Sequence, residues 1–144
     1  MEKTMQSDAP LGKMTVRHDI SADDLALHID LTGLVYTTSE GCPVPTVLVG
    51  LPAPRVPEFY EKFFKPGVKQ RVIVKKNGNK HYVRFGRVLD LYRIMRALDG
   101  RTKVHQQAVR AIKTKLEKKY GKDRLLAALQ KAAAEEAMAK AVSE

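Results

Sequence analysis

Proline placement constrains this chain more than any other feature of its sequence. All seven prolines lie at or before Pro66, and none follows in the remaining residues up to 144. Proline breaks the interior of a helix and removes a backbone donor from a strand. We therefore expect short elements with irregular connections before Pro66, and long uninterrupted helices only after it.

The first periodic segment is residues 25–31, where leucine and isoleucine alternate with other residues. A period of two favours a half-buried strand, which is the interpretation preferred here. A short helix is the alternative for the same stretch, because Ser21 can cap it and Asp23 and Asp24 would lie in its first turn.

Three further short elements are predicted before the last proline. Residues 34–38 and 46–51 are apolar runs separated by a turn-rich segment, which predicts two strands. Pro57 can open a short helix that continues to Phe64. The part of the chain before Pro66 is therefore predicted to be mostly β.

Asn77-Gly78 is the strongest hairpin signal, because this dipeptide favours a two-residue turn between antiparallel strands. The flanking runs, 68–76 and 80–85, have strand composition. A turn at this position sets the cross-strand pairs Val74–His81, Ile73–Tyr82, Val72–Val83 and Arg71–Arg84.

Alternation along the two strands predicts one apolar and one basic face. The apolar face holds Val68, Val72, Val74, Val83 and Phe85, with Gln70 and His81. The basic face holds Lys69, Arg71, Ile73, Lys75, Lys80, Tyr82 and Arg84. The register places Arg71 opposite Arg84 and Lys75 opposite Lys80, and like charges across a strand pair destabilise it. Such a face is more stable with an anion against it.

Three helices are predicted after the hairpin. The first spans 87–99, and Gly100 ends it. The second spans 102–120, with Thr102 as its cap and Val104, Ala108, Ile112 and Leu116 as its apolar stripe. The third is rich in alanine and is capped by Asp123.

These elements together predict an α+β fold with an N-terminal mostly β part, a basic β-hairpin and then three α-helices. Residues 1–12 are expected to be a flexible leader, residues 13–121 a single domain, and residues 122–144 a C-terminal helix. No apolar run is long enough for a membrane span, and Cys42 is the single cysteine. A cytoplasmic protein without a disulfide is therefore expected.

Charge is distributed unevenly along the chain, whose formal net charge is +10. Residues 62–124 contain 20 lysines and arginines and 4 acidic residues, a net charge of +16. Residues 1–61 have a net charge of −5. A segment as positive as 62–124 predicts a polyanionic partner, and nucleic acid is the partner that we favour.

Two interpretations locate the contact. Residues 91–116 are loosely spaced like a helix-turn-helix, in which residues near Lys103 would contact bases and phosphates. Residues 69–98, with a basic strand, an Asn-Gly turn, a second strand and an amphipathic helix, resemble the sheet-plus-helix unit of integrase-arm and plant ethylene-response DNA-binding domains. That resemblance implies that the sheet face, rather than the helix, meets the DNA groove.

Both interpretations place the ligand on residues 69–115. The predicted nucleic-acid-binding residues are Lys69, Arg71, Lys75, Lys80, Tyr82, Arg84, Arg87, Arg101, Lys103, Gln106 and Arg110. Further cations on the helices would extend the phosphate-contacting surface. They are Arg93, Arg96, Lys113, Lys115, Lys118 and Lys119.

The sequence does not support an enzyme, a cofactor or a metal. The densest group of possible metal ligands comprises His18, Asp19, Asp23, Asp24, His28 and Asp30. Its spacing matches no specific metal motif, and a helix N-terminus alone explains the two acids after Ser21. Cys42 has no base nearby in the sequence.

We therefore predict a nucleic-acid-binding protein, with double-stranded DNA favoured over RNA, that acts as a regulator or accessory factor. A homodimer through the C-terminal helix is expected. The alternatives are an adaptor or inhibitor whose basic face binds an acidic protein, and a structural component of a nucleoprotein particle.

Overall fold

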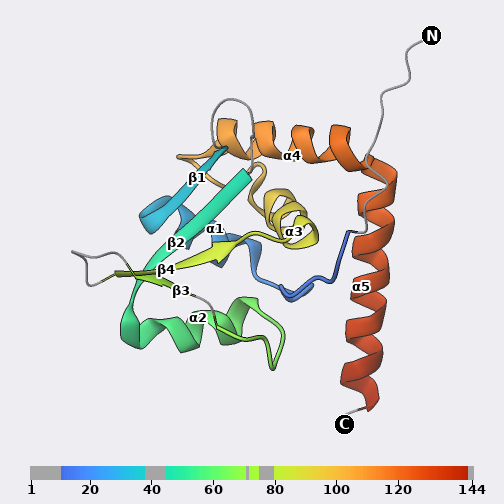
Figure 1. The fold of residues 1–144 in the computed structure, drawn as a ribbon, viewed down its shortest axis with the longest axis horizontal. Helices are drawn as coiled ribbons and strands as arrows, with labels where there is room; N and C mark the ends of the chain where they lie inside the picture. Colours follow the sequence, from blue (N-terminus) through green and yellow to red (C-terminus); the bar gives the residue numbers. More distant parts are fainter. Residues whose placement is uncertain (1–10, 38–44, 71, 75–79, 143–144) are drawn as a thin grey trace.

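The computed structural model describes residues 11–37, 45–70, 72–74 and 80–142. The fold is α+β, as predicted (Figure 1). In chain order its elements are α1 (Ala22–Thr32), β1 (Gly33–Thr37), β2 (Pro45–Pro52), the 3₁₀ turn η1 (Ala53–Arg55), α2 (Val56–Phe63), β3 (Val72–Val74), β4 (Lys80–Phe85), α3 (Val88–Leu98), α4 (Gln106–Tyr120) and α5 (Lys122–Val142). The prediction of a mostly β N-terminal part is only partly right, because α1 and α2 lie there beside two strands.

The predicted strand at residues 25–31 is wrong, and helix α1 takes its place. The Ser21 hydroxyl accepts a hydrogen bond from the Asp24 backbone N–H at 3.2 Å, which is the cap of the alternative interpretation. Leu25 and Ile29, one helical turn apart, are fully buried, whereas Leu27 is 58% exposed. The exposed apolar residues Leu27 and Leu31 alternate in sequence with the buried Leu25 and Ile29. This alternation has the period of a strand although the segment is a helix.

One four-stranded antiparallel sheet has the order β1-β2-β4-β3. The predicted hairpin register is confirmed where the structure describes it, with the pairs Val72–Val83, Ile73–Tyr82 and Val74–His81. The predicted pairs that involve Arg71 and Lys75 lie outside the described residues. On its other side β4 pairs with β2, so that it is a central strand.

The sheet buries one face, called the inner face here, against helices. Every strand residue in the main buried cluster lies on it: Val35, Val47, Val49, Leu51, Val83 and Phe85. Phe85 stacks on Phe64 with ring centroids 5.3 Å apart and also contacts Phe59 of α2. Helix α1 packs against β1 and β2 and lies behind β2 in Figure 1. The core therefore lies between the inner face and the helices.

The N-terminal segment, residues 11–20, is held against α2 and α3. Its centre is Asp90 of α3, whose side chain is 2% exposed. The Asp90 carboxylate accepts hydrogen bonds from the Thr15 backbone N–H at 2.7 Å, the Val16 backbone N–H at 3.0 Å and the Thr15 hydroxyl. Val16 also forms a β-bridge with Phe64. Burial raises the pKa of the Asp90 carboxyl, and the three hydrogen bonds partly offset that effect.

The three helices after the hairpin are confirmed, with shifted starts. Helix α4 begins at Gln106 rather than at Thr102, and its buried stripe is Val109, Ile112 and Leu116. Val104 is 66% exposed because it precedes the helix. Thr102 still caps this turn, since its hydroxyl accepts a hydrogen bond from the His105 backbone N–H at 3.1 Å.

Helices α4 and α5 meet at a corner formed by Gly121 (Figure 1). Gly121 has a φ of 92°, a conformation that favours glycine. Helix α5 begins at Lys122, so Asp123 lies in its first turn rather than before it. Leu125, Leu129 and Ala132 of α5 join the main core. Among the described residues, no helix has the length and apolar character that a bilayer crossing requires.

Replacing Asp90 with alanine should destabilise the fold by about 2 kcal/mol, because it leaves partly buried donors of the N-terminal segment without an acceptor. Chemical denaturation followed by circular dichroism measures this. Asp123→Ala, on an exposed position of α5, is the matched control. Equal stability of the two variants would contradict the role given to Asp90.

Stability should fall as the pH drops through 6.5, because of His28. Burial lowers the pKa of this imidazole, whose ring packs edge-on against Phe59 at 5.3 Å and Phe63 at 5.8 Å. A lowered pKa means that the neutral ring stabilises the folded state above the ordinary value of 6.5, and that protonation at lower pH removes this stability. Thermal melts between about pH 7.5 and about pH 5.5 should show the fall, which His28→Leu should reduce and His18→Gln should leave intact. A His28→Leu variant with the full pH dependence would refute this assignment.

Candidate functional site

The second face of the sheet, called the outer face here, contributes no residue to the main buried cluster. Leu34, Leu48 and Arg84 form one row across β1, β2 and β4, and Gly50 and Tyr82 belong to the next. Leu34 is 43% exposed and Arg84 is exposed, while Leu48 between them is buried. Tyr82 is half-buried, opposite a glycine that has no side chain to cover it. The outer face therefore combines an apolar centre with an aromatic ring and a cation.

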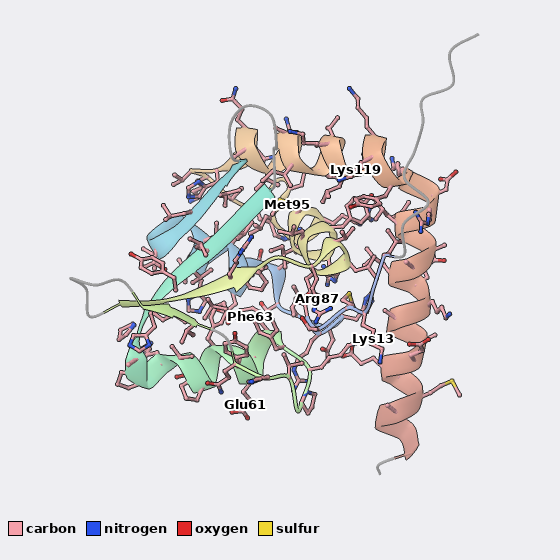
Figure 2. The ribbon with its side chains drawn as sticks, in the orientation of Figure 1. Lys13, Glu61, Phe63, Arg87, Met95 and Lys119 are labelled. Carbon is pink, nitrogen blue, oxygen red and sulfur yellow. The ribbon has the colours of Figure 1, made fainter. Side chains whose placement is uncertain are left out.

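Three exposed cations gather where β4 leads into α3: Lys69, Arg84 and Arg87, called the Arg84 cluster here. The Arg84 side chain folds toward Gly86, with Nε 3.6 Å from the place where a Cβ on that glycine would lie. Arg87 precedes α3 directly and is labelled in Figure 2. All three residues line one cavity of about 650 Å³. In the part of the chain that the structure describes, none of them forms a salt bridge.

A second group of predicted residues surrounds the connection between α3 and α4, and its charges are paired internally. Asp99 accepts hydrogen bonds from the Gln106 side-chain amide at 2.5 Å, Arg110 Nε at 3.2 Å and Lys113 Nζ at 3.2 Å. These contacts, the Gln106 hydrogen bond first, lower the pKa of the Asp99 carboxyl. Arg101 Nε lies 3.2 Å from Asp23 Oδ1. This group is therefore substantially neutralised by the protein's own carboxylates.

The two groups lie at opposite ends of α3. A helix rises about 1.5 Å per residue, so Arg87 and Asp99, which flank the 11 residues of α3, are about 18 Å apart along its axis. The predicted site residues thus form two separate clusters rather than one surface.

The helix-turn-helix interpretation does not match the geometry of this second group. The connection spans residues 99–105, which is longer than the three or four residues typical of that motif. The Gln106 side chain folds back to accept a hydrogen bond from the Gly100 N–H at 2.9 Å. The Lys103 backbone N–H donates to Asp30 at 2.9 Å. The Gln106 side chain, which the helix-turn-helix interpretation makes available to bases, instead closes the turn.

Some predicted residues cannot be placed. Arg71 and Lys75 lie outside the described residues, as does Cys42. The backbone of Lys80 pairs with Pro52, but its side chain lies outside the described part. Of the other predictions on the hairpin, Tyr82 and Arg84 are on the outer face, whereas Lys69 precedes β3 because that strand begins at Val72 rather than at residue 68.

The predicted group of acids and histidines near the N-terminus does not converge on one point. His28 Nε2 lies 3.8 Å from Asp24 Oδ1, and Asp24 also pairs with Lys62 at 3.4 Å. Asp30 instead receives hydrogen bonds from the α3–α4 connection, including one from the Thr102 hydroxyl. Within the described ranges there is no group of three or more such side chains that could hold a metal.

Sequence reasoning missed the roles of Asp30 and Asp99. Asp99 directly precedes the helix-ending Gly100, which placed it at a helix end but gave no sign of its partners across the turn. Asp30 lies 72 residues from Thr102 along the chain, and no sequence signal links them.

Comparison with known proteins shows similarity at the level of structure, not of sequence. No protein-family model matches this chain, and no curated protein matches it. Its structure is similar to that of the homing endonuclease I-CvuI, solved in complex with the I-CreI target and with the DNA not cleaved. The TM-score is 0.51 at 11% sequence identity, over 67% of this chain and 65% of that one. This chain therefore spans less than two thirds of that protein, and the similarity concerns the fold.

Replacing Asp99 with alanine should lower the free energy of unfolding by about 1 kcal/mol, because it removes a shared acceptor from partly exposed cations. Urea titration measures the loss, and Glu135→Ala on the exposed side of α5 is the control. An Asp99→Ala variant as stable as the control would show that these ion pairs contribute nothing to the fold.

Proposed function

We propose that this chain binds nucleic acid, with double-stranded DNA favoured, through the outer face of its sheet and the Arg84 cluster. The single observation that supports the proposal best is the contrast between the two basic groups. The cations around Asp99 are paired with carboxylates. The Arg84 cluster is exposed and has no salt bridge among the described residues, although each of its cations would be stabilised by one. Phosphates are anions that such a cluster can neutralise.

The outer face provides the other contacts that this proposal needs. An antiparallel ribbon fits the major groove of DNA, and arginine on it can contact guanine edges. Arg84 is on β4, a central strand of the four-stranded sheet, one row from Tyr82 on the outer face. The fold similarity to a homing endonuclease that was solved in complex with DNA supports DNA over other polyanions.

We propose a binding role, as a regulator or accessory factor, rather than a catalytic one. Three carboxylates, Asp30, Asp90 and Asp99, are each engaged in hydrogen bonds that hold two parts of the fold together. A carboxylate used in this way is less available as a general base or a metal ligand. This distribution of the acids supports the binding role.

The test is duplex DNA binding measured by fluorescence anisotropy against salt concentration. Three neutralised phosphates predict a slope of log affinity against log salt of about −2.7 or steeper, which is a loss of roughly 40-fold between about 50 and about 200 mM salt. Arg84→Ala should weaken binding about tenfold and reduce the slope by about 0.9. Lys131→Ala, which removes one exposed charge from α5, should change neither.

A flat salt response would reject the proposal. Equal losses from Arg84→Ala and Lys131→Ala would move the contact away from the sheet. Parallel titrations with single-stranded DNA and RNA test the preference for duplex DNA, and tighter binding of either one would overturn that preference.

A further inference from the structure

The cavity beside the Arg84 cluster is larger than the contact with a duplex backbone requires. It is open to solvent on one side and is lined by the N-terminal segment, the end of α2, the segment from Val68 to β3, the end of β4 and the start of α3. Its volume of about 650 Å³ lies within the range of roughly 300–1,000 Å³ that is typical of small-molecule sites. A lone phosphate ion would fill only a small part of it.

The charge that lines this cavity is positive. Among the described residues that line it, Lys69, Arg84 and Arg87 are the cations and Asp90 is the one acid. Both oxygens of Asp90 already accept hydrogen bonds from the N-terminal segment, which leaves this carboxylate little capacity to pair with three cations. The proximity of Arg87 does lower the pKa of the Asp90 carboxyl, but burial has the larger and opposite effect. The cavity therefore favours an anionic ligand.

The rest of the cavity wall is apolar and partly aromatic. Tyr60 and Phe64 line it and stack on one another with centroids 4.4 Å apart and an interplanar angle of 21°. Val68 and Val72 complete this side. Because Phe64 also stacks on Phe85 in the core, the aromatic wall is held rigidly. Tyr60 and Phe64 are 7% and 5% exposed, so they offer a ligand a small aromatic surface, against which a flat ring can pack.

We propose that this cavity binds one nucleoside 5′-monophosphate unit. The phosphate would lie against Arg84 and Arg87, with Lys69 nearby, and the base would lie against the Tyr60 and Phe64 side. A phosphate joined to a flat heteroaromatic ring supplies an anion for the basic side of the cavity and an aromatic face for the other side. The unit could be a free mononucleotide or the 5′-phosphorylated end of a strand.

Isothermal titration with adenosine 5′-monophosphate tests the proposal, with adenosine and inorganic phosphate as separate probes. The monophosphate should bind at least ten times more tightly than either part. Arg87→Gln should weaken its binding at least tenfold because it removes a cation from the phosphate side. Val68→Trp should weaken its binding at least tenfold because the larger side chain occupies the aromatic side of the cavity, and Lys131→Ala should have no effect.

Two results would overturn this proposal. Inorganic phosphate that binds as tightly as the monophosphate would show a phosphate site only. Monophosphate binding that survives both Val68→Trp and Arg87→Gln, in variants whose circular dichroism shows them folded, would place the ligand elsewhere.

Short DNA strands that carry either a 5′-phosphate or a 5′-hydroxyl distinguish a strand end from a free mononucleotide as the ligand. At least tenfold tighter binding of the phosphorylated strand identifies the strand end, and equal binding identifies the free nucleotide. This proposal also stands apart from the duplex contact, because Val68→Trp should leave binding of a 5′-hydroxyl duplex unchanged. If the wild-type protein binds duplex DNA but not the monophosphate, only the cavity proposal is rejected. If it binds the monophosphate but not duplex DNA, only the proposed duplex contact is rejected.

Discussion

The buried carboxylate of Asp90 holds together the part of the molecule on which the candidate site depends. It ties the N-terminal segment to the start of α3 through three hydrogen bonds. The same segment is bridged to Phe64 at the end of α2. These contacts close one wall of the cavity and fix the position of Arg87 relative to the sheet. A charged group pays for its burial here only because it satisfies several backbone and hydroxyl donors at once.

Acidic residues have two different relations to the basic half of the chain. Asp23, Asp30 and Asp99 meet the α3–α4 connection and pair with its cations or cap its backbone. No acid is paired in this way with the Arg84 cluster in the described part of the chain. The net charge of residues 62–124 therefore overstates the number of cations that are available to a ligand. What matters for binding is which cations the fold leaves without a carboxylate.

Local signals predicted much of the fold from the sequence. The Asn77-Gly78 turn gave the correct pairing of Val72 with Val83, because a two-residue turn fixes the register on both sides. Helices α3, α4 and α5 were predicted because glycine and apolar periodicity mark their ends and faces. Helix α1 was mistaken for a strand, since its exposed leucines at 27 and 31 are apolar residues on a solvent-facing side. The pairing of β2 with β4 was not foreseen, because no local pattern specifies which strands become neighbours.

The candidate site was predicted only in part, because local patterns do not specify which distant residues become neighbours. The position of Arg84 and Tyr82 on one face follows from alternation along β4, and the structure agrees. The pairing of Gln106 and Arg110 with Asp99 depends on how the chain folds back after α3, which alternation and spacing do not describe.

The long separation of the N-terminal segment from its partners has a consequence for synthesis. Thr15 is 75 residues from Asp90 and His18 is 118 residues from Glu136, whose carboxylate accepts its backbone N–H. During translation the first residues leave the ribosome well before either acid exists, so their donors must stay bound to water. The β1–β2 and β3–β4 pairs join strands that follow one another in the chain, whereas docking of residues 11–20 closes a far longer stretch of chain and is therefore slow.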